Sequence, residues 1–230
     1  MMVEKIGEVG IDPRNVKYPC TNESVPAVLA GIDPHREDVV VSICGSGDVP
    51  IALSPYVKKV YAVDNSRCQI NYAREQATLL AAQDDLFFRD SLVGNLNPFC
   101  LGGVHDIGTS DLINRKDYFS SRMNDFGDAL HKIEFVEADI LDFLGDFNGG
   151  LHKIYFSNAM AFGGEGILES FSLPGLNPGG LIYLSGSITY YDRKYPHFVK
   201  DSRLTRRAQE VQWGKGCPRW HPKVFKKKAA

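Results

Sequence analysis

A glycine-rich turn between two apolar runs constrains the fold of this chain more than any other feature of its sequence. The first run, residues 39–44, leads into a turn that contains Gly45 and Gly47. The second run, residues 59–63, ends at Asp64. Glycine lets the backbone turn sharply and approach a ligand closely, and an acid at the end of the next strand can accept hydrogen bonds from ribose hydroxyls. The pattern therefore predicts a nucleoside-containing ligand at the carboxyl edge of a parallel sheet.

The composition is that of an ordinary globular protein. The 230 residues are 43% hydrophobic and 23% charged, with a net charge of -2, which suits one large domain with a substantial core. No apolar run approaches the roughly 20 residues that span a bilayer, and the first residues do not resemble a signal peptide. The five cysteines are scattered and show no metal-like spacing. We therefore expect reduced thiols, a cytoplasmic protein and no metal site.

Short apolar runs alternate with helix-like segments along most of the chain. Strands are expected at residues 39–44, 59–63, 133–138, 153–157 and 181–185. Helices are expected at residues 49–54, 66–82, 140–143 and 167–171. This alternation predicts right-handed βαβ units, and hence an α/β, Rossmann-like doubly wound fold whose mostly parallel sheet has helices on both faces.

The N-terminal residues 1–37 are expected to form an extension of a single domain that spans residues 1–230. They are irregular except for a short helix, which Asn22 or Ser24 would cap and Gly31 would end.

The segment of residues 84–131 is too long and too rich in glycine for an ordinary connection between strands. We expect it to be an insertion, helical in part around residues 117–130, that folds over the ligand edge as a lid. Its aromatic side chains would supply an apolar wall of the acceptor pocket: Phe99, Tyr118, Phe119 and Phe126.

The C-terminal segment, residues 192–230, is basic, with 12 Lys and Arg residues against three acids. It is interpreted as a solubilising tail, partly disordered at Lys226, Lys227 and Lys228, or as a contact for an anionic partner. Nucleic acid is the less favoured partner, because the rest of the chain is acidic.

Polar residues or turns accompany the later strands as well. Asp139 follows the strand expected at 133–138, Asn158 follows the strand at 153–157, and a Leu-Asn-Pro-Gly-Gly turn at 176–180 comes before the last strand. Because the carboxyl ends of parallel strands meet at one edge of a sheet, one ligand could span several of these strand ends.

On these residues the chain resembles the class I S-adenosylmethionine-dependent transferases of the methyltransferase fold, over about residues 38–187. The resemblance implies that S-adenosylmethionine is the cofactor and that residues at the strand ends bind it: Cys44, Gly45, Ser46, Gly47, Asp64, Asn65, Asp139, Ile140 and Asn158. By this resemblance residues 44–47 would wrap the amino-acid portion and Asp64 would hold the ribose. Asn65, Asp139 and Ile140 would lie at the adenine, and Asn158 near the transferred group.

The glycine turn departs from the family pattern at its start. Val41 and Ser42 occupy the candidate positions of an acid that helps fix the site near the methionine amine, and Ile43 replaces the usual first glycine. A nicotinamide cofactor is the competing ligand, but its turn normally has three glycines and this one has two.

Two shorter matches indicate a different reaction of the same cofactor. Residues 45–50 are similar to the Gly-Ser-Gly-x-x-Pro turn of nicotianamine synthases, and residues 63–69 are similar to a segment of betaine-lipid synthesis enzymes. Both kinds of enzyme transfer the 3-amino-3-carboxypropyl arm of S-adenosylmethionine.

The leading interpretation is a methyltransferase that acts on a small-molecule acceptor. Transfer of the 3-amino-3-carboxypropyl arm and a non-catalytic cofactor-binding module are the alternatives. Methyl transfer from a sulfonium needs alignment more than acid–base help, so the sequence assigns no catalytic side chain. Cys44 is interpreted as a small packing residue, because no His or acid lies near it in the sequence to activate it.

Overall fold

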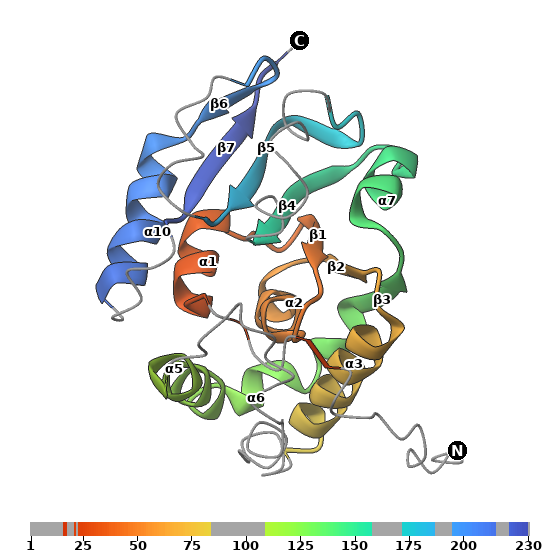
Figure 1. Cartoon of the computed structure of the whole chain (residues 1–230), viewed down its shortest axis with the longest axis vertical. Helices are drawn as coiled ribbons and strands as arrows, with labels where there is room; N and C mark the ends of the chain where they lie inside the picture. The colour runs from red at the N-terminus through yellow and green to blue at the C-terminus, as the bar shows by residue number, and fades with distance from the viewer. Residues whose placement is uncertain are drawn as a thin grey trace.

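The computed structural model describes residues 16–17, 21, 23–83, 109–157, 172–186, 195–214 and 221–229. Its centre is a seven-stranded sheet in the order β3-β2-β1-β4-β5-β7-β6, which Figure 1 shows running from β3 at the right to β6 at the top. In chain order the strands are β1 (Val39–Ile43), β2 (Lys59–Asp64), β3 (Ile133–Glu137), β4 (Leu151–Ser157), β5 (Leu176–Leu184), β6 (Phe198–Lys200) and β7 (Lys223–Lys227).

The strands β1 to β5 pair in parallel, whereas β7 pairs antiparallel with both β5 and β6. From β1 the chain moves outward to β2 and β3, then returns to place β4 on the other side of β1. The order therefore reverses between β1 and β4. In open α/β sheets such a switch point leaves a crevice at the carboxyl ends of the two strands, where ligands bind.

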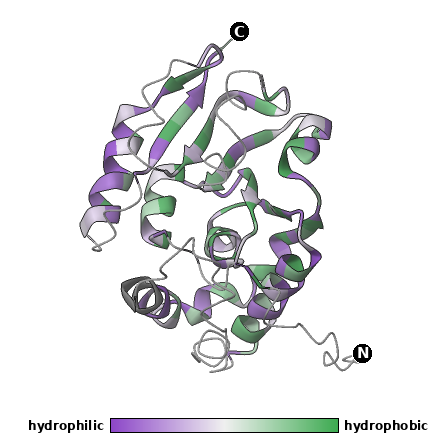
Figure 2. Ribbon diagram, viewed as in Figure 1, coloured by the Kyte–Doolittle hydropathy of each residue, from purple (hydrophilic) through white to green (hydrophobic). Residues whose placement is uncertain are grey.

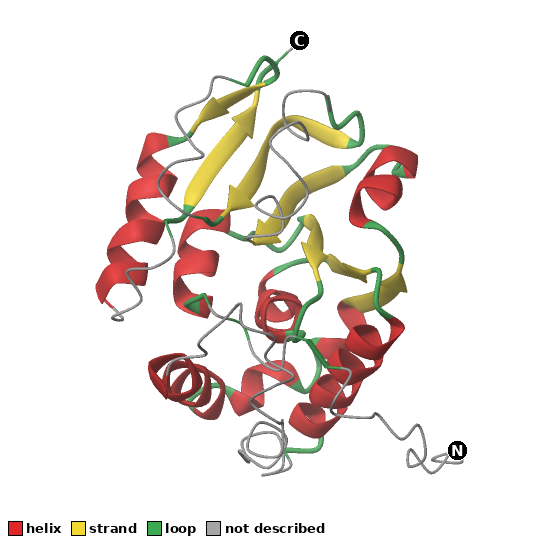
Figure 3. Cartoon of the chain, in the orientation of Figure 1, coloured by secondary structure: helices red, strands yellow, loops and turns green. Residues whose placement is uncertain are grey.

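Helices cover both faces of the sheet, which confirms the predicted α/β fold (Figure 3). The helices of the described residues are α1 (Val25–Ile32), α2 (Asp48–Leu53), α3 (Arg67–Ala81), α5 (Thr109–Ser120), α6 (Met123–Phe126), α7 (Ile140–Asp146) and α10 (Ser202–Gly214), with short 3-10 helices η2 (Ser54–Tyr56) and η4 (Leu130–Lys132). One core cluster joins the sheet to α1, α2, α3, α5, α6 and α10, and a second includes α7.

Strand β1 shows why an uninterrupted apolar run predicts a strand that is covered on both sides. Val40 packs into the first core cluster and Val41 into the second, and both side chains are fully buried. Burying one such side chain stabilises the fold by about 1.5–3 kcal/mol. Figure 2 shows the same contrast across the molecule, with hydrophobic residues on the strands and polar residues along α10.

Helix α1 continues through Gly31 to Ile32, so the prediction that Gly31 ends it is wrong. A Cβ atom at Gly31 would lie 2.7 Å from the ring of Tyr183 in β5. The glycine therefore allows close approach of α1 to the sheet, and the chain turns instead at Asp33, whose φ is 50°.

Strand β5 begins at Leu176, earlier than the predicted residue 181. The turn predicted at 176–180 is an irregular start of this strand, where the register against β4 shifts and Gly179 has a φ of 80°. Glycine is suited to this position because a left-handed backbone costs it little.

The basic C-terminal segment is part of the domain, so its interpretation as a partly disordered tail is wrong for the described residues. Helix α10 packs beside α1, and β7 lies inside the sheet between β5 and β6. The Nζ atom of Lys227 donates to the carbonyl oxygens of Leu173 at 2.8 Å and Leu176 at 2.7 Å. Lys226 and Lys227 end a strand whose first three residues, Lys223, Val224 and Phe225, are buried.

The insertion is described from residue 109 onward, where α5 and α6 form. Tyr118, Phe119 and Phe126 are buried in the first core cluster, and their rings contact one another. The prediction that these three line an open acceptor pocket is therefore wrong. Phe99, most of the predicted lid and the helix expected at 167–171 lie outside the described residues.

In the part of the chain that the structure describes, we find no helix long and apolar enough to cross a membrane.

Candidate functional site

The glycine turn follows β1 and enters α2 directly. Its backbone is left-handed at Gly45, with a φ of 49°, and at Gly47, with a φ of 86°. A Cβ atom at Gly47 would lie only 2.8 Å from the Cβ atom of Ala73 in α3, whereas a Cβ atom at Gly45 would meet no atom within 4 Å. Gly47 is therefore fixed by packing against α3, and Gly45 faces open space.

The structure brings the turn together with Asp64, the acid at the end of β2. Asp64 Oδ2 accepts a hydrogen bond from the backbone N–H of Gly45 at 3.2 Å, and Oδ1 accepts one from the N–H of Ser66 at 3.0 Å. Burial raises the pKa of Asp64, while the N–H donors of Ser66 and Gly45 act in the opposite direction. Each carboxylate oxygen can accept a further hydrogen bond, so Asp64 has capacity left for a ligand.

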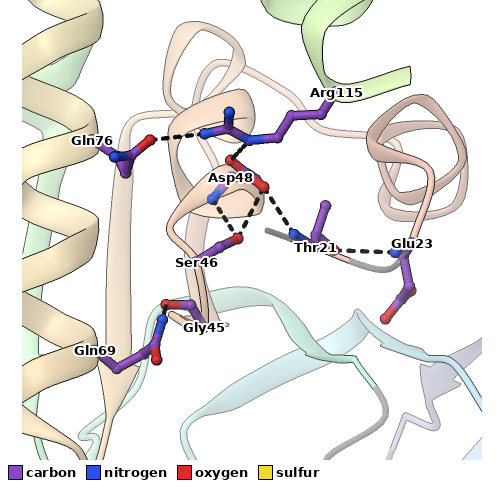
Figure 4. A network of polar contacts seen from close by, with 8 residues as sticks. All are labelled: Thr21, Glu23, Gly45, Ser46, Asp48, Gln69, Gln76 and Arg115. Carbon is purple, nitrogen blue, oxygen red and sulfur yellow. Dashed lines mark hydrogen bonds and ion pairs between the residues drawn. The ribbon is translucent and has the colours of Figure 1, made fainter. Parts of the chain in front are cut away.

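Gln69 of α3 holds the other polar group of the same peptide. Its Nε2 atom donates to the carbonyl oxygen of Gly45 at 2.7 Å (Figure 4). Its Oε1 atom accepts from the N–H of Lys17 at 3.2 Å. Because Gly45 is bonded through both N–H and C=O, the turn is fixed relative to β2 and α3.

Behind the turn, Asp48 is fully buried at the start of α2. Its Oδ1 atom lies 2.8 Å from Nε of Arg115 in α5, an arginine whose side chain is 10% exposed. Its Oδ2 atom accepts from Ser46 Oγ and from the N–H of Thr21, both at 2.9 Å. Arg115 also donates to Gln76 Oε1 at 2.9 Å (Figure 4). This network ties the turn to segments far away in the sequence, and it was not foreseen from sequence patterns.

The two candidate positions for an acid at the start of the glycine turn hold no carboxylate. Val41 and Ser42 are both fully buried, and Ser42 Oγ donates to the carbonyl oxygen of Ile43 at 2.9 Å. The start of the turn therefore offers no acidic side chain toward the carboxyl edge.

The residues predicted to contact an adenine lie at the ends of β2 and β3. The N–H of Ala138 donates to the carbonyl oxygen of Asp64 at 3.0 Å, which places Asp139 at the strand end beside β2. Asp139 caps α7, since its Oδ1 accepts from the N–H of Leu141 at 2.8 Å. Asn65 and Asp139 are exposed and Ile140 is half-buried. Asn158, the remaining predicted site residue, lies outside the described residues.

A second polar cluster lies on the other side of the switch point, around Glu23. This side chain is 4% exposed, and its Oε1 atom accepts from Tyr155 Oη at 3.1 Å and from Ser157 Oγ. Both partners belong to β4. Ser185 follows β5, and its N–H donates to the carbonyl oxygen of Ser157 at 2.9 Å. We call Glu23, Tyr155, Ser157, Tyr183 and Ser185 the Glu23 cluster.

Three polar atoms of the Glu23 cluster make no hydrogen bond of good geometry among the described residues, although the hydroxyls of Tyr183 and Ser185 lie near the Glu23 carboxylate. The three atoms are Glu23 Oε2, Tyr183 Oη and Ser185 Oγ. Burial raises the pKa of Glu23 to about 7, against the lowering effect of nearby hydroxyls, first that of Ser157. Sequence reasoning missed Glu23 because it stands in a segment without a motif, more than a hundred residues from its partners. A lone acid before an apolar helix is the only local signal.

Cys44 is buried in the core beside the turn, and burial raises the pKa of its thiol. Its interpretation as a packing residue is confirmed. The described residues contain no group of three or more His, Cys, Asp or Glu side chains arranged to hold a metal ion.

The chain was compared with known sequences and with solved structures. No protein-family model matches the chain, and no curated protein matches it. Among solved structures, a conserved hypothetical protein of Streptococcus pyogenes is 8% identical with a TM-score of 0.53, covering 88% of this chain and 94% of that one. TrmN from Thermus thermophilus is 16% identical with a TM-score of 0.50, and the match covers 96% of this chain but 52% of TrmN.

A putative methyltransferase of Streptococcus mutans, solved in complex with SAH, is 11% identical with a TM-score of 0.43, covering 86% of this chain and 93% of that one. The chain has the Rossmann-like α/β fold of the Streptococcus pyogenes protein and TrmN.

The fold of this chain extends beyond the region of sequence resemblance, residues 38–187. Helix α1 precedes that region, and α10 and β7 follow it, yet all three pack into the same core. At these identities the likeness establishes the fold alone.

Proposed function

We propose that the protein is an S-adenosylmethionine-dependent methyltransferase, with the cofactor across the carboxyl ends of β1, β2 and β3. The observation that carries this proposal is the hydrogen bond between Gly45 N–H and the Asp64 carboxylate. This bond joins the glycine turn and Asp64, which are the two strongest signals in the sequence, beside the switch point of the sheet.

The residues present fit this cofactor. The open face at Gly45 allows close approach to the backbone of residues 44–47, where the amino-acid portion would lie. The lone pairs of Asp64 that the backbone leaves unused suit the hydroxyls of a ribose. Asn65, Asp139 and Ile140 would border the adenine, and we retain Asn158 as a predicted contact near the transferred group.

S-adenosylmethionine supplies a methyl group on a positively charged sulfur, which leaves as a neutral thioether. The protein then has to align an acceptor with the methyl carbon and exclude water. The fixed turn suits alignment, because Gln69 binds the carbonyl group of Gly45 and Ser46 donates to Asp48, which Arg115 holds in turn. We propose a small acceptor, because the acidic chain outside the C-terminal segment disfavours nucleic acid, and a cytoplasmic location, because the scattered cysteines favour reduced thiols.

Transfer of the 3-amino-3-carboxypropyl arm is the second candidate. The observation that favours it is the buried, carboxylate-free start of the turn at Val41 and Ser42. In arm transfer the amino-acid portion leaves with the product, so an altered site at that end would be expected.

Product analysis distinguishes the two reactions. Incubation with S-adenosylmethionine and a panel of small acceptors, followed by mass spectrometry, should yield S-adenosylhomocysteine from methyl transfer. Methylthioadenosine as the product formed only with acceptor would instead establish arm transfer. Neither product, together with failure of the folded protein to bind either nucleoside, would contradict both candidates.

A further inference from the structure

We propose that the Glu23 carboxylate binds the acceptor and takes its proton, and that the acceptor is an amine. The inference rests on the proposed function, which supplies the group that is transferred. It goes further because it names a catalytic residue and a chemical class of substrate.

The position of Glu23 is the first support. Ser42 of β1 pairs with Tyr155 of β4, so the strand ends that carry the glycine turn and Ser157 lie next to each other. Glu23 contacts β4 directly, and Thr21 links it to the glycine turn. Its carboxylate accepts from Ser157 Oγ. Its N–H donates to Thr21 Oγ1 at 3.3 Å, and the N–H of Thr21 donates to Asp48 at the start of α2 (Figure 4). The carboxylate is therefore at the switch point, next to the proposed cofactor site.

The unsatisfied atoms are the second support. A buried carboxylate oxygen without a partner is costly, and native proteins keep few such groups outside functional sites. Glu23 Oε2 makes no hydrogen bond of good geometry among the described residues, and the hydroxyls of Tyr183 and Ser185, which lie close enough to lower its pKa, make none either. No Lys, Arg or His side chain of the described chain forms an ion pair with Glu23.

The oxygens of Glu23, Tyr183 and Ser185 suit an amine acceptor better than an alcohol. An ammonium group offers up to three N–H donors, which could reach Glu23 Oε2 and the oxygens of Tyr183 and Ser185. Its positive charge would also offset the buried negative charge, which a neutral hydroxyl would not do.

The proposed step transfers the methyl group from sulfur to the nitrogen of the amine. An ammonium acceptor first gives one proton to the Glu23 carboxylate and becomes a neutral amine with a lone pair. That lone pair forms the new N–C bond to the methyl carbon while the S–C bond breaks, and its electron pair stays on sulfur. The product is a methylated ammonium and a neutral thioether, and the proton on Glu23 passes to solvent.

The charge state of Glu23 is suited to this role near neutral pH. A pKa of about 7 lets the carboxyl group both accept and release a proton there. The titratable groups that face it are Tyr155 of β4 and Tyr183 of β5. Burial raises the pKa of each tyrosine, so both stay protonated while Glu23 titrates.

The test compares the wild type, Glu23→Gln and a control, Glu37→Gln, which alters an exposed carboxylate in the loop after α1. Calorimetry first measures S-adenosylhomocysteine binding, which should be equal in all three within about 2-fold. With this nucleoside saturating, n-butylamine, benzylamine and 1,4-diaminobutane are then titrated to millimolar concentration. At least one amine should bind the wild type and the control, and bind Glu23→Gln about 10-fold more weakly.

The outcomes separate the two proposals. If S-adenosylhomocysteine does not bind the wild type, the proposed function fails and this inference falls with it. If the nucleoside binds but no amine does, or if Glu23→Gln binds amine as well as the wild type, only this inference is overturned. Weaker nucleoside binding by Glu23→Gln would also overturn it, because Glu23 would then serve the cofactor.

A second measurement covers the case in which Glu23→Gln does not fold. Carbon-13 NMR of the wild type, labelled at glutamate carboxyls, should show one carboxyl that titrates near pH 7 and shifts on addition of the amine. Amine affinity should rise as the pH passes through this value, since the carboxylate form binds the cation. A titrating carboxyl that does not respond to any amine contradicts the inference.

Discussion

Asp64 and Gly45, 19 positions apart in the sequence, are joined by a hydrogen bond of 3.2 Å from the glycine N–H to the carboxylate. The contact links the ends of two neighbouring parallel strands, and Gln69 holds the carbonyl group of the same glycine. A ligand that reaches the turn therefore meets the acid as well. Such a preformed arrangement lowers the cost of ordering the site on binding.

The two glycines of the turn should respond differently to alanine. Gly47→Ala combines a left-handed backbone with a clash against Ala73, so we expect a loss of unfolding free energy of about 2–4 kcal/mol. Gly45→Ala meets no atom and should lose only about 1 kcal/mol from its backbone conformation. Urea unfolding of both variants measures the difference. Equal losses would contradict the assigned role of packing against α3.

Removing Arg115 should be strongly destabilising. The variant Arg115→Met leaves the fully buried Asp48 carboxylate without its ion pair, at a cost of about 3–5 kcal/mol in unfolding free energy. Lys59→Met is the matched control, because its pair with Glu134 is partly exposed and should be worth less than about 1 kcal/mol. Chemical denaturation compares the two. A loss for Arg115→Met no larger than that of the control would show that the buried network does not hold the turn.

Stability should depend on pH through Glu23. Its pKa is about 7 in the folded chain against an ordinary value of 4.5, so the folded state binds the proton more tightly than the unfolded state. The stabilisation from this group is complete below 4.5 and is lost as the pH rises through about 7. Relative to Glu23→Gln, the wild type should lose about 3 kcal/mol of unfolding free energy across that window.

Thermal or urea unfolding at several pH values measures this difference between the two proteins. The Gln variant keeps an oxygen that can accept from Tyr155 and Ser157, which makes it a close match for the protonated acid. Parallel stability profiles for the two proteins would mean that Glu23 does not titrate in this range.

The sequence predicts the centre of the sheet well, because local patterns determine it. In β1, consecutive valines face opposite core clusters, and in α3 the cap at Ser66 and the apolar spacing both indicate a helix. The contact between Asp64 and the turn also follows, since parallel strand ends meet at one edge.

Other features of the fold and the site could not be predicted, because they depend on contacts between segments that are far apart in the sequence. Strand β7 has buried Val224 and Phe225 among lysines, and its charge suggests a tail until Lys227 is seen to bind two carbonyl groups. The pairing of Asp48 with Arg115 and of Glu23 with β4 joins segments that share no local pattern. Gly31 looks like a helix end, but the approach of Tyr183 explains it.

The central claim is that the Gly45–Asp64 contact marks a binding site for S-adenosylmethionine. Isothermal titration with S-adenosylhomocysteine tests it most directly, using the wild type, Asp64→Ala and the control Asp146→Ala, which alters an exposed acid of α7. We predict saturable binding at one site per wild-type chain, unchanged in the control and weakened by about 1–3 kcal/mol in Asp64→Ala through loss of charged hydrogen bonds. A folded wild type that binds no nucleoside, or equal affinity in all three proteins, would contradict the claim.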